Sequence, residues 1–426
     1  MIKTVDAHTL NLADYVRRGD GIVWGQASSE PLTLIDLLIA QRADIGVVDV
    51  FVGLALTDTL LPEHTDFIRP TSYGALGTSM RLQNAGVLTL LPCHYSALQR
   101  WMQSGHIPVD VVFVQLSPPG PDGTHSLGYS NDYLPTAMKK ARVVIAEINE
   151  HVPWTHLDAP IDPDLIDIAI ETSRLPPALT PAKPRDLDRA IASHIAGVIE
   201  DGATLQYGIG SIPAALLASL SGHKDLGLHS GLLSPEVIAL HESGVITNRR
   251  KPINPGVSVG TMAVGGMSMN GFLHDNPQIE LHQTQSTHGA ASLSQIDNLV
   301  AINSALEVDL FGQVNAEQVG DRYLGAIGGQ VDYMHAANTA PNGLSIIAMP
   351  ASMGKSGGSR ITPKLNGPFV TTCRTDVDLV VTEFGVADLR GKNVARRAEA
   401  LIAIASPDHQ DELARSMDVI NAANRV

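Results

Sequence analysis

The sequence predicts an α/β protein made of two related domains, and two observations carry this prediction. The chain has 426 residues, whereas a single hydrophobic core stops growing at roughly 250–300 residues. Short apolar runs rich in β-branched residues alternate with stretches of helical pattern, which is typical of strands covered by helices on both faces. We therefore expect two α/β domains with parallel or mixed sheets flanked by helices.

The apolar runs predict the positions of the buried strands. Each is a near-continuous series of Val, Ile, Leu and other apolar residues, as expected where both faces of a sheet are covered. The predicted strands lie at 44–54, 86–92, 109–116, 142–148, 299–303, 344–350 and 377–383.

A proline-rich segment at 174–186 (RLPPALTPAKPRD) predicts the domain boundary, because proline discourages both helix and central strand. We expect an N-terminal domain at 1–180 and a C-terminal domain at 181–426. Residues 12–41 and 195–222 both predict a helix, an acidic-Gly turn, a strand, a small-residue loop and a second helix with proline near its start. This likeness suggests an internal duplication, although two unrelated β-loop-α units would also look alike.

Composition limits the possible partners and compartment. The net charge is −15, and the chain has no run of Lys and Arg of the kind that nucleic acids or anionic membranes require, so we expect neither partner. The only cysteines are Cys93 and Cys373, which suits a reducing compartment and a cytoplasmic location. The first residues do not resemble a signal peptide, and no long apolar stretch predicts a membrane span.

Three familiar motifs fail. The loop at 208–213 begins like a dinucleotide-binding fingerprint, but Pro213 stands where the third glycine is needed. The triplet at 354–356 resembles the end of a P-loop, yet the first glycine of that motif would fall at Met349. His241 and Glu242 lack the second histidine of a zinc protease, and the other histidines are scattered, so no metal is expected.

The segment at 305–310 carries the strongest chemical signal. It directly follows an apolar run, and if the strand continues, its period-two alternation puts Glu307 and Asp309 on the face opposite three apolar residues. The alternative is an ordinary solvated strand face. Asp309 would either orient Glu307 or tie down the backbone.

Two glycine-rich segments follow. In 325–332 (GAIGGQVD), the pair Gly328-Gly329 would let backbone N–H groups approach a ligand and form an oxyanion hole, or would simply make a tight turn. The segment at 350–365 interleaves basic residues with glycine and serine, which suggests a phosphate cradle or a surface loop.

Together these segments resemble the acetyl-CoA hydrolase/transferase family, particularly its 4-hydroxybutyrate coenzyme A transferase branch of class I CoA-transferases. The resemblance spans nearly the whole chain and is strongest in INSALEVDLFGQVN (302–315), GAIGGQVDYMHAA (325–337), SIIAMPA (345–351) and VVTEFGVADLRGKNVARRAEALI (380–402). It implies two related α/β halves, coenzyme A as a substrate, no metal or other cofactor, and a homodimer or higher homo-oligomer. Where relatives often read H-T-E-M, this chain has His229-Ser230-Gly231-Leu232, which lacks the acidic side chain.

The resemblance also implies roles for particular residues. Glu307 would be the covalent nucleophile, and Gly328 with Gly329 would serve the oxyanion. The candidate coenzyme A-binding residues are Gly208, Gly210, Ile327, Gln330, Ala351, Lys355 and Arg360. The candidate substrate-pocket residues are Gln26, Ser72 and His229.

This assignment predicts a ping-pong reaction. Glu307 attacks the thioester carbonyl, the released thiolate attacks the glutamyl carbonyl, and the glutamyl-coenzyme A thioester passes coenzyme A to a second acid. If water reaches an acyl intermediate, the result is hydrolysis. An acyl-CoA hydrolase and a non-catalytic acyl-CoA-binding protein therefore remain alternatives, and the acyl group stays open among acetate, propionate, butyrate, 4-hydroxybutyrate and small dicarboxylates.

Overall fold

The computed structural model describes residues 2–180, 183–354 and 357–423, with side chains up to Met417. The chain forms two compact units: unit 1 contains Met1–Thr180, Gly231–Pro235 and Val257–Gly289, and unit 2 contains the remaining residues. The predicted boundary after Thr180 is where the chain first passes from unit 1 to unit 2. Two later stretches that we expected in the C-terminal domain return to unit 1.

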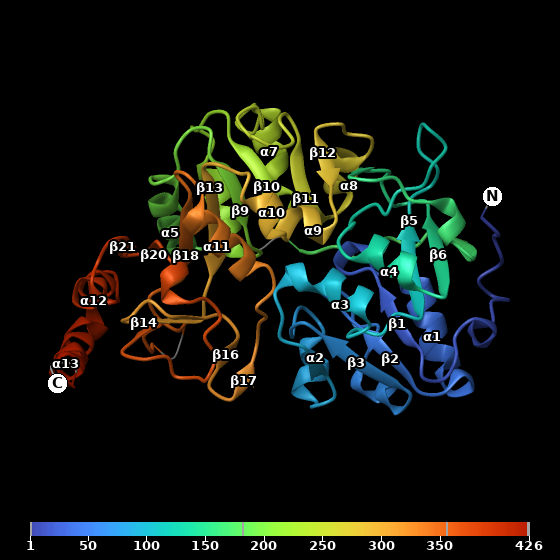
Figure 1. Cartoon of the computed structure of the whole chain (residues 1–426), viewed down its shortest axis with the longest axis horizontal. Helices are drawn as coiled ribbons and strands as arrows, with labels where there is room; N and C mark the ends of the chain where they lie inside the picture. Colours follow the sequence, from blue (N-terminus) through green and yellow to red (C-terminus); the bar gives the residue numbers. More distant parts are fainter. Residues whose placement is uncertain (1, 181–182, 355–356, 424–426) are drawn as a thin grey trace. The chain divides into compact units, whose positions relative to one another are not determined.

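Unit 1 is built on a parallel sheet with the order β4-β3-β2-β1-β5-β6-β8 (Figure 1). The strand order runs outward from β1 in one direction and from β5 in the other, and ligands of open α/β sheets bind outside the carboxyl ends of the strands at such a reversal. The strands are β1 (Gly21–Trp24), β2 (Val48–Phe51), β3 (Ile68–Ser72), β4 (Thr89–Leu90), β5 (Val111–Leu116), β6 (Val143–Asn149) and β8 (Ile168–Thr172).

The helices of unit 1 follow the sequence signals only in part. Helix α1 (Leu32–Ile45) begins directly after Pro31, as predicted, and ends at Gly46, whose φ of 86° suits a residue without Cβ. The helix expected near residue 12 is only a 3-10 turn, Leu12–Asp14. The other elements of unit 1 are α2 (Met80–Asn84), α3 (Leu98–Ser104), α4 (Leu134–Lys140), α8 (Met267–Leu273), α9 (Thr284–His288) and the parallel strands β11 (Ser258–Ala263), β12 (Ile279–Leu281) and β7 (His156–Leu157).

Unit 2 repeats this plan. Its strands have the order β21-β20-β18-β13-β9-β10 and are parallel except for β21, and here the order reverses between β9 and β13. In both units a strand beside the reversal leads through a short loop into a helix, which supports the suspected duplication. The strands are β9 (Thr204–Tyr207), β10 (Gly227–Leu233), β13 (Leu299–Ser304), β18 (Leu344–Ala348), β20 (Leu379–Thr382) and β21 (Gly385–Asp388).

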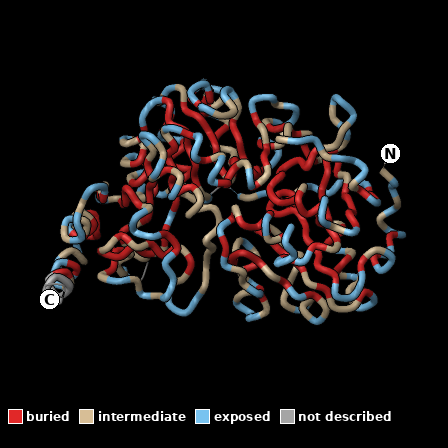
Figure 2. The backbone as a smooth tube through the Cα atoms, viewed as in Figure 1, coloured by how far each residue is buried: buried red, intermediate tan, exposed pale blue. Residues whose placement is uncertain are grey.

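All seven predicted strands coincide with strands of these two sheets. Except for the short edge strand β4, their residues are mostly buried and belong to the interior coloured red in Figure 2. The helices of unit 2 are α5 (Asp186–Ala196), α6 (Ser211–Ser219), α7 (Glu236–Glu242), α10 (Ala290–Leu293), α11 (Gln330–Thr339), α12 (Val394–Ala403) and α13 (Pro407–Ala423).

One prediction about unit 2 is wrong. The strand at 299–303 does not continue through Glu307, because β13 ends at Ser304. Strand β14 (Glu307–Asp309) instead belongs to a small separate sheet with the order β15-β14-β19. All three residues of β14 are buried, so its carboxylates are not on an ordinary solvated face. The other short strands are β15 (Val314–Asn315), β16 (Gln318–Val319), β17 (Arg322–Tyr323) and β19 (Ile361–Thr362).

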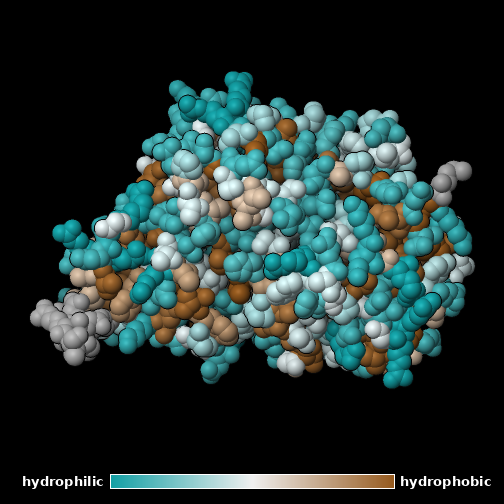
Figure 3. Space-filling view, in the orientation of Figure 1, coloured by the Kyte–Doolittle hydropathy of each residue, from teal (hydrophilic) through white to brown (hydrophobic). Residues whose placement is uncertain are grey.

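The face of the molecule in Figure 3 carries hydrophilic residues over most of its area, with smaller apolar areas between them. Within the described ranges, no helix is long and apolar enough to cross a membrane.

Candidate active site

The glycine loop after β9 lies against the end of β13 at the reversal in unit 2. Gly208 N–H donates to the carbonyl of Ile302 at 3.3 Å, and a Cβ at Gly208 would lie 4.0 Å from Asn303 Oδ1. Gly210 has a φ of 133°, which only glycine adopts readily, and it is the N-cap of α6. This places the predicted loop and the chain that leads to Glu307 at the same edge of the sheet.

The Glu307 carboxylate is buried and held by two asparagines. Glu307 is only 4% exposed. Oε1 accepts from Asn315 Nδ2 and from the Asn366 backbone N–H, both at 3.0 Å, and Oε2 accepts from Asn366 Nδ2 at 2.7 Å. A carboxylate oxygen has two lone pairs, so these contacts fill Oε1, whereas the contacts from the described residues leave one acceptor position on Oε2.

Asn315 joins this carboxylate to the hairpin β16–β17. Its Nδ2 also donates to the carbonyl of Gln318 at 2.8 Å, while its Oδ1 accepts the backbone N–H groups of Glu317 and Gln318, both at 3.0 Å. Every polar atom of the Asn315 side chain is therefore bonded. Sequence reasoning missed both asparagines, although Asn315 ends a segment already singled out.

Glu317 is a second buried carboxylate that sequence reasoning missed, and it orders the same region. Its Oε1 accepts the Thr371 hydroxyl at 2.7 Å and its Oε2 accepts the Tyr323 hydroxyl at 2.8 Å. Its backbone carbonyl accepts Gly325 N–H at 3.2 Å. The start of the second glycine-rich segment is thus fixed to the chain that follows Asn315.

Asp309 ties down the backbone. Its Oδ1 accepts the backbone N–H groups of Phe311 and Gln313, both at 2.9 Å, across the turn that links β14 to β15. Burial raises the pKa of this carboxyl, and these backbone hydrogen bonds oppose the rise. Of the two roles that the sequence left open, the geometry favours the turn.

The glycine pair stands at the start of α11. Gly328 has a φ of 54° and open space where a Cβ would be, and Gly329 is the N-cap of the helix. Gln330 Nε2 donates to the Thr372 hydroxyl at 3.0 Å, and the Ile327 carbonyl accepts Gln330 N–H at 3.3 Å. Backbone N–H groups at a helix start favour negative charge. The oxyanion role of this pair stays a prediction.

Arg360 hydrogen-bonds to the backbone that directly precedes Glu307. Its Nη1 donates to the carbonyls of Leu306 at 3.1 Å and Ala305 at 3.4 Å, and its own carbonyl accepts Val308 N–H at 2.8 Å. Burial, followed by the neighbouring charge of Arg185, lowers the pKa of this guanidinium. The opposite charge of Glu383 works against this shift, and the phosphate-binding role stays a prediction.

Two further predicted coenzyme A-binding residues, Ala351 and Lys355, belong to the same segment, 350–365. Ala351 is fully buried; its N–H donates to Glu383 Oε2 at 2.9 Å and its carbonyl accepts Arg360 N–H at 2.9 Å. Lys355 lies outside the described residues.

In unit 1 the predicted pocket residue Gln26 is fully engaged by the protein. Its Nε2 donates to Asp132 Oδ2 at 2.8 Å and contacts the Tyr95 hydroxyl at 2.5 Å, while its Oε1 accepts the Tyr73 hydroxyl at 3.0 Å and Leu54 N–H at 2.9 Å. Gln26 is 1% exposed, and burial raises the pKa of Asp132. This network stiffens the carboxyl edge of the sheet.

The other two predicted pocket residues are also fully buried. Ser72 ends β3, and its hydroxyl accepts Gly74 N–H at 3.3 Å. His229 lies within β10.

Gly231 occupies the position where the family's motif has an acidic residue. A Cβ there would come within 2.9 Å of His288 Nε2. A side chain at this position would therefore have to displace the imidazole, whose Nδ1 lies 2.8 Å from the Thr287 hydroxyl.

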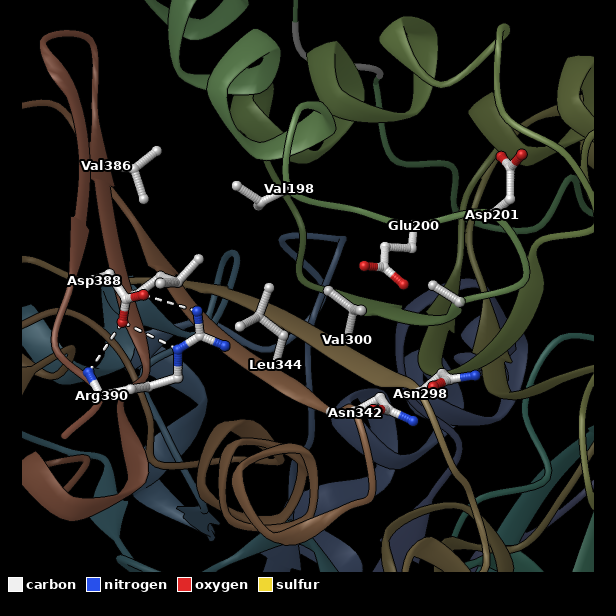
Figure 4. A pocket seen from close by; sticks show the side chains of 13 residues that line it. Val198, Glu200, Asp201, Asn298, Val300, Asn342, Leu344, Val386, Asp388 and Arg390 are labelled. Atoms are coloured by element: carbon white, nitrogen blue, oxygen red, sulfur yellow. Dashed lines mark hydrogen bonds and ion pairs between the residues drawn. The ribbon is translucent and has the colours of Figure 1, made fainter.

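One cavity of unit 2 lies elsewhere. It offers about 360 Å³ to a water-sized sphere and is lined by residues at the amino ends of β9, β13 and β18 (Figure 4). Asp388 and Arg390 form a two-pronged ion pair at its wall, with distances of 3.0 and 2.8 Å. The carboxyl ends of these parallel strands carry the glycine loop and Glu307, so this cavity is not part of the candidate site.

Family models identify the class of the protein. Residues 3–180 match the acetyl-CoA hydrolase/transferase N-terminal domain, and residues 265–417 match the C-terminal domain. The chain belongs to the acetyl-CoA hydrolase/transferase family, as the sequence segments indicated, and it is an enzyme that transfers coenzyme A.

Individual proteins of known name are similar to this chain over most of its length. The chain is 38% identical over 401 residues to the 4-hydroxybutyrate coenzyme A transferase of Clostridium kluyveri, covering 92% of both chains. It superposes on the 4-hydroxybutyrate CoA-transferase from Porphyromonas gingivalis with a TM-score of 0.84 at 32% identity, covering 98% of this chain and 97% of that one. It also superposes on RipA from Yersinia pestis with a TM-score of 0.92 at 30% identity, covering 98% of both.

Proposed function

We propose that this enzyme moves coenzyme A between an acyl-CoA and a small carboxylic acid of the 4-hydroxybutyrate, butyrate or acetate type, through a glutamyl-coenzyme A thioester on Glu307. The observation that carries the proposal is the Glu307 carboxylate, which follows the strand at the reversal of unit 2 and keeps an acceptor position on Oε2. The relatives named for 4-hydroxybutyrate and for butyryl-CoA:acetate transfer support the substrate class.

The reaction is an acyl transfer in two halves. Oε2 of Glu307 attacks the thioester carbonyl, the C–S bond breaks, and an acyl-glutamyl anhydride and a thiolate form. The thiolate then attacks the glutamyl carbonyl carbon, which releases the acyl group as a free carboxylate and leaves coenzyme A on Glu307. A second acid reverses both steps and leaves as its coenzyme A thioester.

The hydrogen bonds from the two asparagines have opposite effects on the proposed reaction at Oε1 and at Oε2 of Glu307. Oε1 remains the carbonyl oxygen of the anhydride and of the thioester, so its two donors, Asn315 Nδ2 and Asn366 N–H, are placed to stabilise the oxyanion when the thiolate attacks. The Asn366 Nδ2 bond to Oε2 must open before Oε2 can bond to carbon. Because Glu307 is only 4% exposed, the segment carrying Asn366 has to move when the substrate enters.

Mass spectrometry of the intact protein tests this mechanism. After mixing with butyryl-CoA or acetyl-CoA, we expect a coenzyme A adduct that borohydride removes and that peptide mapping places on Glu307. Glu307→Gln should form no adduct, while Asp309→Asn, on the same buried strand, should still form one. Exchange without an adduct on Glu307 would refute the nucleophile but keep the transferase.

The alternatives predict different results. An acyl-CoA hydrolase would release free acid and coenzyme A at an undiminished rate when no acceptor acid is present. A non-catalytic acyl-CoA-binding protein would bind the thioester and leave it intact. We also propose a homodimer or higher homo-oligomer, which light scattering coupled to gel filtration measures directly.

A further inference from the structure

Glu317 is a buried carboxylate that takes no part in the proposed chemistry. It is 2% exposed, and burying a carboxylate costs free energy unless hydrogen bonds compensate. Two hydroxyl groups supply such bonds: Thr371 donates to Oε1 at 2.7 Å and Tyr323 donates to Oε2 at 2.8 Å. Hydrogen bonds to a carboxylate are stronger than those between neutral groups, so Glu317 holds both side chains firmly.

Thr371 ends the segment that carries one of the donors to Glu307. Asn366, five residues earlier, donates its backbone N–H to Glu307 Oε1 at 3.0 Å, and most residues between Asn366 and Thr371 are exposed. Thr371 itself is buried. Its hydroxyl accepts Ala316 N–H at 2.9 Å, and its own N–H donates to the Val314 carbonyl at 2.7 Å. Thr371 is therefore the fixed end of this segment.

The ring of Tyr323 contacts the middle of the same segment. Its centroid lies 5.8 Å from that of Phe369, and the two rings meet edge to face at 87°, which is a favourable arrangement for an aromatic pair. Because the Tyr323 hydroxyl is bonded to Glu317, this carboxylate restrains the segment at two places. It acts on Thr371 directly and on Phe369 through Tyr323.

Glu317 is also connected to the second donor to Glu307. Its backbone N–H donates to Asn315 Oδ1 at 3.0 Å, and Asn315 Nδ2 donates to Glu307 Oε1, also at 3.0 Å. Glu317 thus joins the two chain segments that supply donors to Oε1, by its backbone to Asn315 and by its side chain to the segment of Asn366. In the proposed reaction negative charge develops on Oε1, and donors stabilise it most when they are already in place.

We propose that Glu317 is a positioning residue, whose carboxylate fixes the segment of Asn366 so that Asn366 N–H and Asn315 Nδ2 bond to the same oxygen of Glu307. The proposal rests on the proposed function and names a further requirement of its chemical step. Glu317 exchanges no atom with the substrate. Loss of its carboxylate should therefore slow the chemical step and leave the affinity for the coenzyme A thioester nearly unchanged.

The rate at which the coenzyme A adduct forms in a single turnover tests the proposal. Mass spectrometry of the intact protein after rapid quenching gives the rate constant and the final fraction of modified chains. With butyryl-CoA, Glu317→Ala should lower the maximal rate constant by about 10²-fold and leave the half-saturating concentration and the final fraction nearly unchanged. A role in folding alone would lower the final fraction and leave the rate constant at the wild-type value.

Three further variants make this test specific. Glu317→Gln, whose amide oxygen can still accept the Thr371 hydroxyl, should lose much less of the rate than Glu317→Ala. Asp321→Asn changes an exposed carboxylate of the same hairpin and should match the wild type. Thr371→Val combined with Glu317→Ala should be no slower than the slower single variant, because both substitutions remove the same hydrogen bond.

The outcomes separate this inference from the proposed function. If folded Glu317→Ala forms the adduct at the wild-type rate, or if the double variant multiplies the two separate losses, the positioning role is overturned. If Glu317→Ala does not fold, Glu317→Gln and Thr371→Val decide, and wild-type rates in both would overturn it.

If the wild type forms no adduct and exchanges no coenzyme A, the proposed function fails, and hydrogen exchange decides the inference. Glu317→Ala should then speed exchange of the Asn366 and Thr371 amides while β13 keeps its protection, and Asp321→Asn should not. Unchanged exchange at these two amides would overturn the inference.

Discussion

Replacing Glu30 with glutamine should change how the stability of unit 1 depends on pH. Burial raises the pKa of Glu30 from 4.5 to about 8. Each pKa unit corresponds to about 1.4 kcal/mol, so ionising Glu30 in the folded protein costs on the order of 5 kcal/mol. The neutral glutamine avoids this cost at every pH.

The direction in which stability changes with pH follows from the pH at which the folded and the unfolded chain release the proton of Glu30. Below about pH 4.5 the carboxyl is protonated in the folded and the unfolded chain, and its contribution to stability is fully present. As the pH rises toward about 8, the unfolded chain releases the proton while the folded chain keeps it, so stability falls. Above that pH the loss is complete and the contribution no longer changes.

Urea unfolding followed by tryptophan fluorescence measures this effect in unit 1 alone, because Trp24, Trp101 and Trp154 all belong to that unit. We expect the wild type to lose up to about 5 kcal/mol relative to Glu30→Gln between about pH 5 and pH 9. Glu63→Gln removes an exposed carboxylate instead and should track the wild type. Parallel pH curves for the wild type and Glu30→Gln would refute the buried neutral carboxyl.

Three further predictions concern the candidate site. Asn315→Ala removes the 3.0 Å side-chain donor to Glu307 Oε1 and should lower kcat by about 10²-fold with little change in KM; a shift confined to KM would contradict a role in stabilising the oxyanion. Arg360→Lys should raise KM for coenzyme A thioesters, because the compact ammonium group of lysine cannot bond to two carbonyls and a phosphate at once. Unchanged kinetics would show that Arg360 does not bind the phosphate. Gly231→Ala should lower the free energy of unfolding by about 1–3 kcal/mol, since its Cβ would meet His288 Nε2 at 2.9 Å; a variant with the wild-type melting curve would show that the imidazole yields freely.

The large strands could be predicted from the sequence because both faces of each sheet are covered, and such strands need continuous apolar runs. The start of α1 was readable for a different reason: Pro31 fixes the backbone before the helix. Strand β14 was misjudged because its alternation matches a half-exposed strand, whereas one of the two asparagines bonded to Glu307, Asn366, comes from a distant segment.

The residues that surround the functional groups could not be predicted from the local sequence pattern. Asn366 lies 59 residues after Glu307, and no periodicity connects the two positions. Gln26 was predicted as a substrate-pocket residue, and no pattern in the sequence indicated that Asp132, far along the chain, would bond to its amide.

The return of 257–289 to unit 1 has a consequence for biosynthesis. Asn131 N–H donates to the Thr261 carbonyl at 3.0 Å and Asn131 Nδ2 to the Leu281 carbonyl at 2.7 Å, so the N-terminal part completes its hydrogen bonds only with chain that is made much later. On the ribosome, unit 1 must therefore wait until Gly289 has emerged, by which time the first part of unit 2 is already outside. A gene fragment that stops at Thr180 should yield an incompletely folded product, because it lacks the later stretches that complete unit 1.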